Sequence, residues 1–253
     1  MRIAALYDIH GNLPALEAVL AEVEREPIDA VVVGGDVLPG PMSGETLAKL
    51  DALPLAWEAI RGNGENDILA ACRGEVPTRV PPVFAEVLRR VGDELTPPQR
   101  DAIAAWPDTI AHDVPGLGPV LFCHATPRDD NEIFTRLTPE RVLRPIFDEV
   151  GAGVVVCGHT HMQFDRRVGD VRVVNAGSVG MPFGDPGAWW AIVGPDIELR
   201  HTPYDADAAT ARFRASGFPK IPGFDILHPP PEEQMLAVFE AAALTAVRGE
   251  SET

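Results

Sequence analysis

The sequence has few cysteines and no long apolar run. Its three cysteines, Cys72, Cys123 and Cys157, show no short paired spacing, so we expect free thiols in a reducing cytoplasm rather than a disulfide framework. The apolar run near the N-terminus is broken by Asp8 and His10, which is not typical of a signal peptide. No segment approaches the roughly 20 apolar residues that a membrane helix needs. These absences predict a soluble cytoplasmic protein without a membrane partner.

Basic residues are also scarce, because 21 Lys and Arg residues stand against 38 Asp and Glu residues and give a formal net charge of −17. A surface this acidic repels polyanions. We therefore expect no stable nucleic-acid binding and no binding to anionic membranes, unless bound cations reverse the local field. Solubility alone would also account for the charge.

The apolar content is sufficient for a large core. Hydrophobic residues make up 45% of the 253 residues, which suits one large α/β domain or at most two small ones. The first 36 residues are typical of a β-α-β unit, with apolar strands at 3–7 and 30–33 around a helix of regular apolar spacing. Further strands are predicted at 55–60, 109–113, 119–123 and 153–157, and further helices at 82–91, 96–105 and 139–149.

Two β-hairpins follow, with turns at Gly169-Asp170 and Gly194-Pro195. Together with the buried strands and alternating helices, they predict an α/β fold, a four-layer α/β/β/α sandwich of two mixed sheets over residues 1–202. Residues 203–253 are predicted to form a C-terminal helical extension packed on or beside this domain, ending in a helix from about Glu232 to Val247. That helix could dock on its own domain or join two copies in a homo-oligomer.

Polar residues of only three kinds follow the apolar strands. Taken singly, an Asp or Asn there is usually a turn residue or helix cap, and a histidine is usually just hydrogen-bonded. Five strands end in this way, however, and the carboxyl ends of strands in an open α/β sheet meet at one edge, where ligands bind. Four of the seven histidines belong to the set; His112, His201 and His228 do not. The set comprises Asp8, His10, Asp36, Asn63, His124, His159 and His161.

This set predicts an open metal centre. Carboxylate, amide and imidazole ligands suit Mn²⁺, Fe, Zn²⁺ or Ni²⁺, whereas cysteine-rich sites form closed zinc centres. Seven ligands are more than one such ion needs, so two ions sharing a bridging carboxylate are the natural arrangement. Cys123 and Cys157 directly precede ligand loops, but at strand ends we expect them to be buried thiols that face the core.

Five short motifs carry a resemblance to a known family. They are “DIHGN” (8–12), “GGDVLPG” (34–40), “GNGEND” (62–67), “CHATP” (123–127) and “GHTHM” (158–162). In this order they resemble the five signatures of the calcineurin-like metallophosphoesterases, and “NAGSVG” (175–180) resembles a loop of the small prokaryotic branch. The resemblance spans residues 1 to about 195.

The resemblance implies a role for each predicted ligand. The first metal ion would be held by Asp8, His10 and His161. The second would be held by Asn63, His124 and His159, and Asp36 would bridge the two ions. The implied reaction is hydrolysis of a small phosphoester by a metal-bridging hydroxide, with Mn²⁺ as the expected metal and Fe, Zn²⁺ or Ni²⁺ as alternatives. Asp36, Asn63 and His124 are the expected catalytic residues.

The sequence departs from the family pattern at Gly64. Many members carry a histidine directly after the asparagine of the third motif, where it assists the leaving group, and loss of a general acid typically costs about 10²–10⁴-fold in rate. Branches without this histidine are often diesterases, so phosphodiester hydrolysis is favoured over monoester hydrolysis. A phosphomonoesterase or protein phosphatase of the same mechanism is one alternative, and a catalytically weak metal-binding interaction scaffold is the other.

Two residues are candidates for substrate binding. Arg128 could clamp a phosphate in a bidentate manner, or it could pair with Asp129 or Asp130 at the surface. Asn12 matches the family pattern, and we expect it to fix the first ligand loop rather than to bind metal. Arg61 and Ser178 are weaker candidates for the role of Arg128. Met181, Pro182 and Phe183 could shape a substrate pocket or simply pack.

Overall fold

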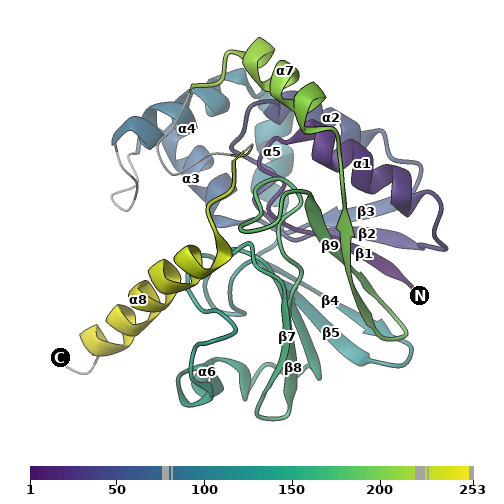
Figure 1. Cartoon of the computed structure of the whole chain (residues 1–253), viewed down its shortest axis with the longest axis vertical. Helices are drawn as coiled ribbons and strands as arrows, with labels where there is room; N and C mark the ends of the chain where they lie inside the picture. The colour runs from purple at the N-terminus through teal and green to yellow at the C-terminus, as the bar shows by residue number, and fades with distance from the viewer. Residues whose placement is uncertain (76–79, 81, 220–225, 227, 251–253) are drawn as a thin grey trace.

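Two five-stranded sheets form the centre of the protein (Figure 1). The computed structural model describes residues 1–75, 80, 82–219, 226 and 228–250, with the side chains of 244–250 excepted. The strands are β1 (Ile3–Leu6), β2 (Ala30–Val33), β3 (Ala56–Ala59), β4 (Thr109–Val114), β5 (Gly118–Cys123), β6 (Val154–Cys157), β7 (Phe164–Val168), β8 (Val171–Asn175), β9 (Ala188–Val193) and β10 (Ile197–Thr202).

Both sheets are mixed, as predicted. The first has the order β10-β9-β1-β2-β3, in which β1, β2 and β3 are parallel and β9 is antiparallel to β1. The second has the order β4-β5-β6-β8-β7, in which β5, β6 and β8 are parallel. The two hairpins predicted from the sequence are β7-β8 and β9-β10, and they lie in different sheets.

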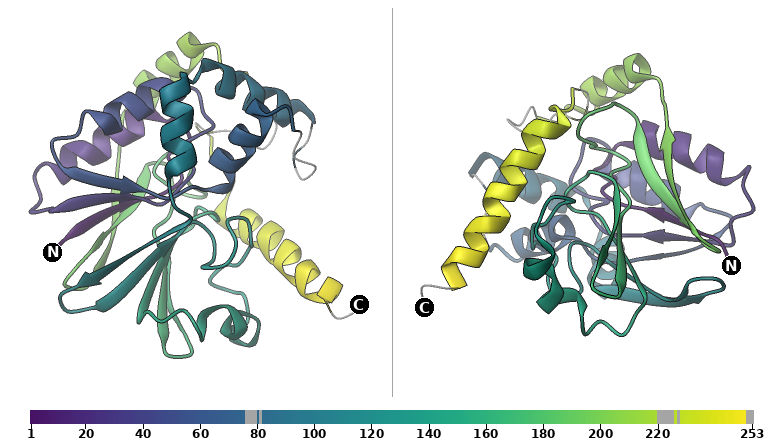
Figure 2. Two further views of the ribbon diagram at one scale, coloured as in Figure 1. Left: turned by 180° about the vertical axis from the view of Figure 1, so that it is seen from behind. Right: turned by 60° about the horizontal axis from the view of Figure 1, so that its bottom comes forward.

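Helices cover the outer faces of the sheets and complete the predicted four layers (Figures 1 and 2). The helix at residues 13–23 packs on the first sheet, and the helix at residues 140–147 packs on the second sheet. The helices are α1 (Leu13–Val23), α2 (Ser43–Asp51), α3 (Asn63–Cys72), α4 (Pro82–Glu94), α5 (Pro97–Ala105), α6 (Glu140–Phe147), α7 (Ala206–Ser216) and α8 (Glu232–Glu250).

Alternating side chains of the central strand β1 supply two separate apolar cores. Ala4 and Leu6 point outward into the core beneath α1, while Ile3 and Ala5 point into the core between the sheets. All four side chains are fully buried. A third core lies beneath α6, where Phe147 packs against the outer face of the second sheet. Burial on both faces explains why the inner strands are continuously apolar in the sequence.

Two helices, α2 and α3, have no clear signal in the sequence. The sequence of α2 is only weakly apolar, with buried Leu47 and Leu50 as its main core residues. The helix α3 begins at Asn63 itself, so the third ligand motif forms its first turn. The start of this helix consists of the polar residues of the motif, so regular apolar spacing does not predict it.

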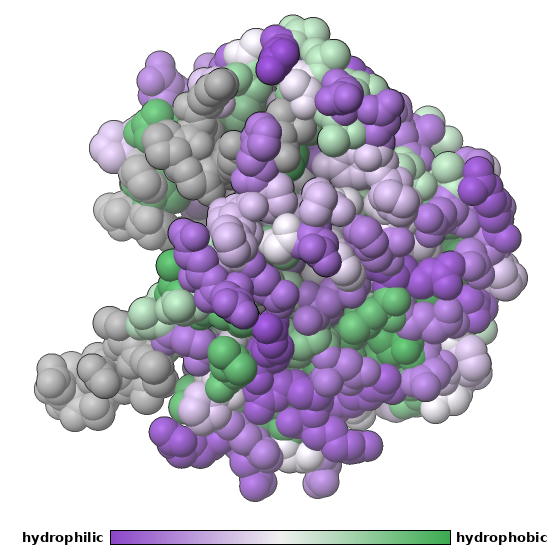
Figure 3. Space-filling model, viewed as in Figure 1, coloured by the Kyte–Doolittle hydropathy of each residue, from purple (hydrophilic) through white to green (hydrophobic). Residues whose placement is uncertain are grey.

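The last helix, α8, extends outward from the body of the protein and carries the C-terminus at its tip (Figures 1 and 2). Its inner face is anchored: Leu236 is buried, and Glu240 accepts hydrogen bonds from Thr135 and Thr138. The outward face, including Val238, is exposed. None of the helices that the structure describes combines the length and apolar character needed to cross a membrane. The face seen in Figure 3 is largely hydrophilic, with hydrophobic residues in separate patches.

Candidate metal centre

The backbone of the ligand loops is unusual. Among the described residues, only five that are not glycine have a positive φ, between 48° and 65°. This left-handed region costs a non-glycine residue about 1–3 kcal/mol and persists where the surroundings fix it, often at functional sites. The five residues are Asp8, His10, Asp36, His159 and His161. Every one of them belongs to the predicted ligand set.

The predicted ligands come from both sheets. Asp8, Asp36 and Asn63 follow β1, β2 and β3 of the first sheet. His10 also follows β1, and the other three histidines of the set follow β5 and β6 of the second sheet. The expectation that all five strand ends share one sheet edge is therefore wrong. The carboxyl ends of the parallel strands of two stacked sheets meet at the same end of the sandwich instead.

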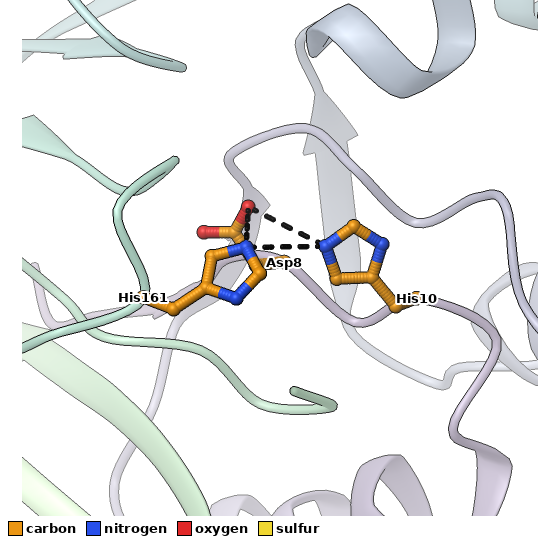
Figure 4. A group of neighbouring side chains, drawn as sticks. All are labelled: Asp8, His10 and His161. Carbon is orange, nitrogen blue, oxygen red and sulfur yellow. Dashed lines mark hydrogen bonds and ion pairs between the residues drawn. The ribbon is translucent and has the colours of Figure 1, made fainter. Parts of the chain in front are cut away.

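Asp8, His10 and His161 point toward one another (Figure 4). The Nε2 atoms of His10 and His161 are 3.2 Å apart. The Oδ1 atom of Asp8 lies 3.2 Å from the Nε2 of His161 and 3.9 Å from the Nε2 of His10. All three side chains are buried. The arrangement leaves a single point that all three ligand atoms face.

A second, overlapping group consists of Asp8, Asp36 and His124. The Oδ1 of Asp36 lies 3.6 Å from the Nε2 of His124, whereas its Oδ2 lies 3.7 Å from the Nε2 of His10. Asp36 thus directs one oxygen toward each group. The Oδ1 of Asn63 lies 3.1 Å from the Nε2 of His124.

The ring orientation of two histidines suits the binding of a cation. The Nδ1 of His124 is 2.9 Å from the carbonyl oxygen of Gly34, and the Nδ1 of His161 is 2.6 Å from that of Met181. A carbonyl can only accept, so in the neutral imidazole each Nδ1 carries the proton and each Nε2 presents a lone pair. These lone pairs face other acceptors, the oxygens of Asn63 and Asp8. A metal ion resolves such contacts between acceptors.

His159 completes the set of predicted ligands. Its ring centroid is 5.2 Å from that of His124, and its buried Nε2 has no hydrogen-bond partner among the residues that the structure describes. A buried ring nitrogen without a partner is uncommon in folded proteins. Its backbone N–H donates to the Oδ2 of Asp8. The structure therefore brings the seven predicted ligands close together, five of them buried and two, Asn63 and His159, half-buried.

Burial and interactions between neighbouring rings shift the pKa values of two histidines in the cluster. Burial, reinforced by His161, lowers the pKa of His10 to about 3. Burial, reinforced by His124, lowers the pKa of His159 to about 3. Both rings are therefore neutral near pH 7, which is the form that binds metal.

The two carboxyl groups shift in opposite directions. Burial, with the nearby carboxylates of Glu65 and Asp8, raises the pKa of Asp36 well above its usual range. Burial also acts to raise the pKa of Asp8, but attraction to His161 and the neighbouring histidines outweighs it and holds that pKa below its usual range. The two carboxyl groups of the cluster therefore differ in how readily they ionise, and Asp8 ionises more readily than Asp36.

Glu65 is a functional residue that the sequence analysis missed. Its carboxylate is fully buried and accepts hydrogen bonds from the backbone N–H groups of Asp36, Leu38 and Gly62 at 2.8, 2.9 and 2.9 Å. It therefore fixes the loop that carries the carboxylate of Asp36. The available signal was a glutamate three residues after Gly62, the spacing of a helix N-cap and its partner.

Asn12 has a positioning role, as expected from its place in the first motif. It is fully buried, its Oδ1 accepts a hydrogen bond from the N–H of Ala15, and its Nδ2 donates to the carbonyl of Gly180 and the hydroxyl of Tyr204. Because its amide has no exposed surface, the structure does not favour direct contact between Asn12 and a substrate.

Arg128 is exposed and pairs with Glu132. It lines a cavity of about 300 Å³ that also reaches His124, so it lies near the cluster. Arg61 donates hydrogen bonds to the carbonyl groups of Ala104 and Trp106 and to the carboxylate of Asp108, which gives it a structural role.

The other weak candidates lie close to the ligands. Ser178 donates to the backbone carbonyl of Asp8 and accepts from the N–H of Met181, so it also positions a ligand loop. Phe183 stacks on His161 with ring centroids 5.1 Å apart. Met181 and Pro182 are buried beside it.

Comparison with known proteins agrees with the motifs and the fold. The sequence profile of the calcineurin-like phosphoesterase superfamily domain matches residues 1–195. No curated protein matches the chain. The structure of a metallophosphoesterase from Sphaerobacter thermophilus is 25% identical and superposes with a TM-score of 0.68, covering 87% of this chain and 95% of that one. A hypothetical protein, PH1004, from Pyrococcus horikoshii OT3 is 18% identical and shares the fold, with a TM-score of 0.72 over 94% of this chain and 97% of that one. The chain belongs to the calcineurin-like phosphoesterase superfamily.

Proposed function

We propose that this metal-dependent phosphoesterase uses a binuclear centre to hydrolyse phosphodiesters in preference to monoesters. The observation that carries the binuclear proposal is the position of Asp36, whose two oxygens face His10 and His124 separately. Asp8, His10 and His161 would hold one ion, and Asn63, His124 and His159 the other. Metal ions in such a site polarise phosphoryl oxygens and activate water near neutral pH.

The protein itself prepares the site in three ways. Glu65 and Asn12 hold the ligand loops through buried hydrogen bonds to the backbone. The carbonyl groups of Gly34 and Met181 fix the tautomers of His124 and His161. Burial keeps His10 and His159 neutral, because it lowers the pKa of each to about 3. All three effects are present before metal or substrate binds.

Two observations support the preference for diesters. Gly64 has no side chain to protonate a leaving group, and a Cβ atom there would lie 2.2 Å from the carbonyl oxygen of Leu38. Among the residues that the structure describes, the cavity that reaches His161 has no Lys or Arg in its lining, and the cavity that reaches His124 has only Arg128, which pairs with Glu132. A singly charged diester suits such surroundings better than a doubly charged monoester.

Hydrolysis assays on metal-stripped protein reloaded with Mn²⁺ test this function. Bis(p-nitrophenyl) phosphate and p-nitrophenyl phosphate serve as matched diester and monoester. Faster metal-dependent turnover of the diester is the expected result. Faster turnover of the monoester would make the enzyme a phosphomonoesterase, and two bound ions without turnover of either ester would favour the interaction scaffold. Parallel loading with Zn²⁺, Ni²⁺ and Fe²⁺ tests the expected preference for Mn²⁺.

A further inference from the structure

A cavity of about 510 Å³ opens directly beside the metal centre. The ligand His161 forms part of its lining, so a molecule bound at the centre can extend into it. Its other walls come from three separate segments: the residues after His161, the loop and strand around 183–189, and the chain that leads into α8. The lining residues are His161, Met162, Gln163, Phe183, Gly184, Asp185, Trp189, Pro229, Pro231 and Glu232.

The C-terminal extension is attached firmly enough to serve as one of these walls. The N–H of Gly184 donates to the carbonyl of Pro230 at 3.0 Å. Phe239 of α8 packs on Phe183 with ring centroids 5.8 Å apart, and Phe183 in turn stacks on His161. A row of three rings therefore connects α8 to a metal ligand. Because residues 229–239 lie beyond the 195 residues of the matched domain, this wall is not part of the shared domain.

The chemistry of the cavity suits an apolar group. Phe183, Trp189, Met162 and the two prolines supply flat or apolar surface, and aromatic walls favour planar partners. Within the described part of the chain, the charged lining residues are both acidic, Asp185 and Glu232, and Glu232 pairs with Arg136. This described lining offers no Lys or Arg to a second phosphate group.

The cavity on the other side of the centre, next to His124, has a different character. Its lining includes three aspartates, Asp108, Asp129 and Asp130, together with Asn66 and two threonines. It is smaller, about 300 Å³, and strongly polar. An apolar organic group bound beside His124 would strip water from these polar side chains, which costs more free energy than covering the mainly apolar walls beside His161.

We infer that the cavity beside His161 is a subsite for an aryl or similarly flat, uncharged group of the substrate, and that the C-terminal extension helps to select it. The inference rests on the proposed function, because it assumes that the metal centre binds the phosphoryl group. It predicts a substrate with one phosphoryl group and an apolar organic part, and it argues against polyphosphates and nucleoside diphosphates.

Equilibrium binding of two phosphonates to the Mn²⁺-loaded full-length protein tests the subsite. Phenylphosphonate and methylphosphonate carry the same anionic group and are not hydrolysed as esters. The difference between their affinities, measured by calorimetry, therefore reports the contribution of the organic group. We expect phenylphosphonate to bind about tenfold more tightly, which corresponds to partial burial of one ring. Trp189→Ala should reduce the ratio of the two affinities to about two- to threefold, and Pro231→Ala should also reduce this ratio. Thr109→Ala, in the lining of the other cavity, is the matched control and should leave it unchanged.

Equal binding of the two phosphonates by the wild-type protein would overturn the subsite, whether or not the protein hydrolyses diesters. An unchanged ratio in both Trp189→Ala and Pro231→Ala, with full metal content, would also overturn it. A reduced ratio only in Thr109→Ala would place the organic group in the other cavity. Preferential binding of phenylphosphonate without hydrolysis of any ester would support the subsite while removing the proposed function.

Discussion

The carboxylate of Glu65 accepts a hydrogen bond of 2.8 Å from the backbone N–H of Asp36, inside the protein and away from solvent. Glu65 does not itself belong to the ligand set. Through this bond and those from Leu38 and Gly62, it holds the loop that aims the two oxygens of Asp36. The position of the Asp36 carboxylate thus depends on a residue that need not touch metal or substrate.

Glu65→Gln should weaken metal binding and lower stability. Glutamine has a single acceptor oxygen, so its NH₂ group would face at least one buried backbone N–H and leave it without a partner. An unsatisfied buried donor costs about 1–3 kcal/mol, and loss of a residue that orients a ligand typically costs about 10–100-fold in metal affinity. Metal titration and thermal unfolding measure both effects. Glu86→Gln, at an exposed position of α4, is the control; equal behaviour of the two variants would contradict the role of Glu65.

Gly64→Ala and Gly64→His should both destabilise the protein, and the histidine should not create a leaving-group acid. The new Cβ would lie 2.2 Å from the carbonyl oxygen of Leu38 and 2.9 Å from the Oδ1 of Asp36. Relieving such contacts with backbone typically costs about 1–3 kcal/mol. Denaturant unfolding measures the loss of stability, and the monoester assay should show no gain for Gly64→His.

The matched control for Gly64 is Gly44, which is also helical. Nothing lies within 4 Å of the position where a Cβ would be added at Gly44. Gly44→Ala should therefore be neutral or stabilise the protein by about 0.4–1 kcal/mol, because alanine favours helix more than glycine does. Equal stability of Gly64→Ala and wild type would show that the loop at Leu38 can move aside.

The sequence places the candidate ligands at strand ends because strand ends are simple to locate. Continuous apolar runs such as Val154–Cys157 mark buried strands, and the polar residues that follow must lie at their ends. The four-layer fold follows from the same alternation of strands and helices, and it is confirmed. Which sheet each ligand follows depends on strand order. That order is set by contacts between residues far apart in the chain, so the local pattern does not reveal it.

The supporting residues are harder to predict. Glu65 resembles any helical glutamate in the sequence, and its function depends on three N–H groups, two of which lie about 30 residues earlier in the chain. The position of Phe183 between His161 and Phe239 likewise joins three distant segments. Such roles arise from tertiary packing, which neither propensity nor spacing encodes.

Asp36→Asn should abolish binding of at least one metal ion and lower kcat/KM by about a thousandfold or more, since the loss of metal charge at a phosphoryl group costs several kcal/mol. The amide has only one oxygen, so it cannot direct an oxygen toward both His10 and His124. Elemental analysis and the diester assay give the two readouts. Asp51→Asn, an exposed position at the end of α2, should match wild type in both. Full turnover by Asp36→Asn would refute the bridging role.

Removal of metal should destabilise the folded protein, because the metal-free cluster holds lone pairs that face one another at 3.1–3.2 Å in a buried space. A ligand present at a hundred times its Kd stabilises the native state by about 2.7 kcal/mol, and each kcal/mol shifts Tm by about 2–4 °C for a domain of this size. Chelation should therefore lower Tm by about 5–10 °C for each ion removed, and addition of Mn²⁺ should restore it. Asp36→Asn should respond less to chelation than wild type does, since it holds less metal at the start. If chelation empties the wild-type protein without changing its Tm, the cluster does not depend on metal for its structure, and the mutual orientation of Asp8, His124 and His161 needs another explanation.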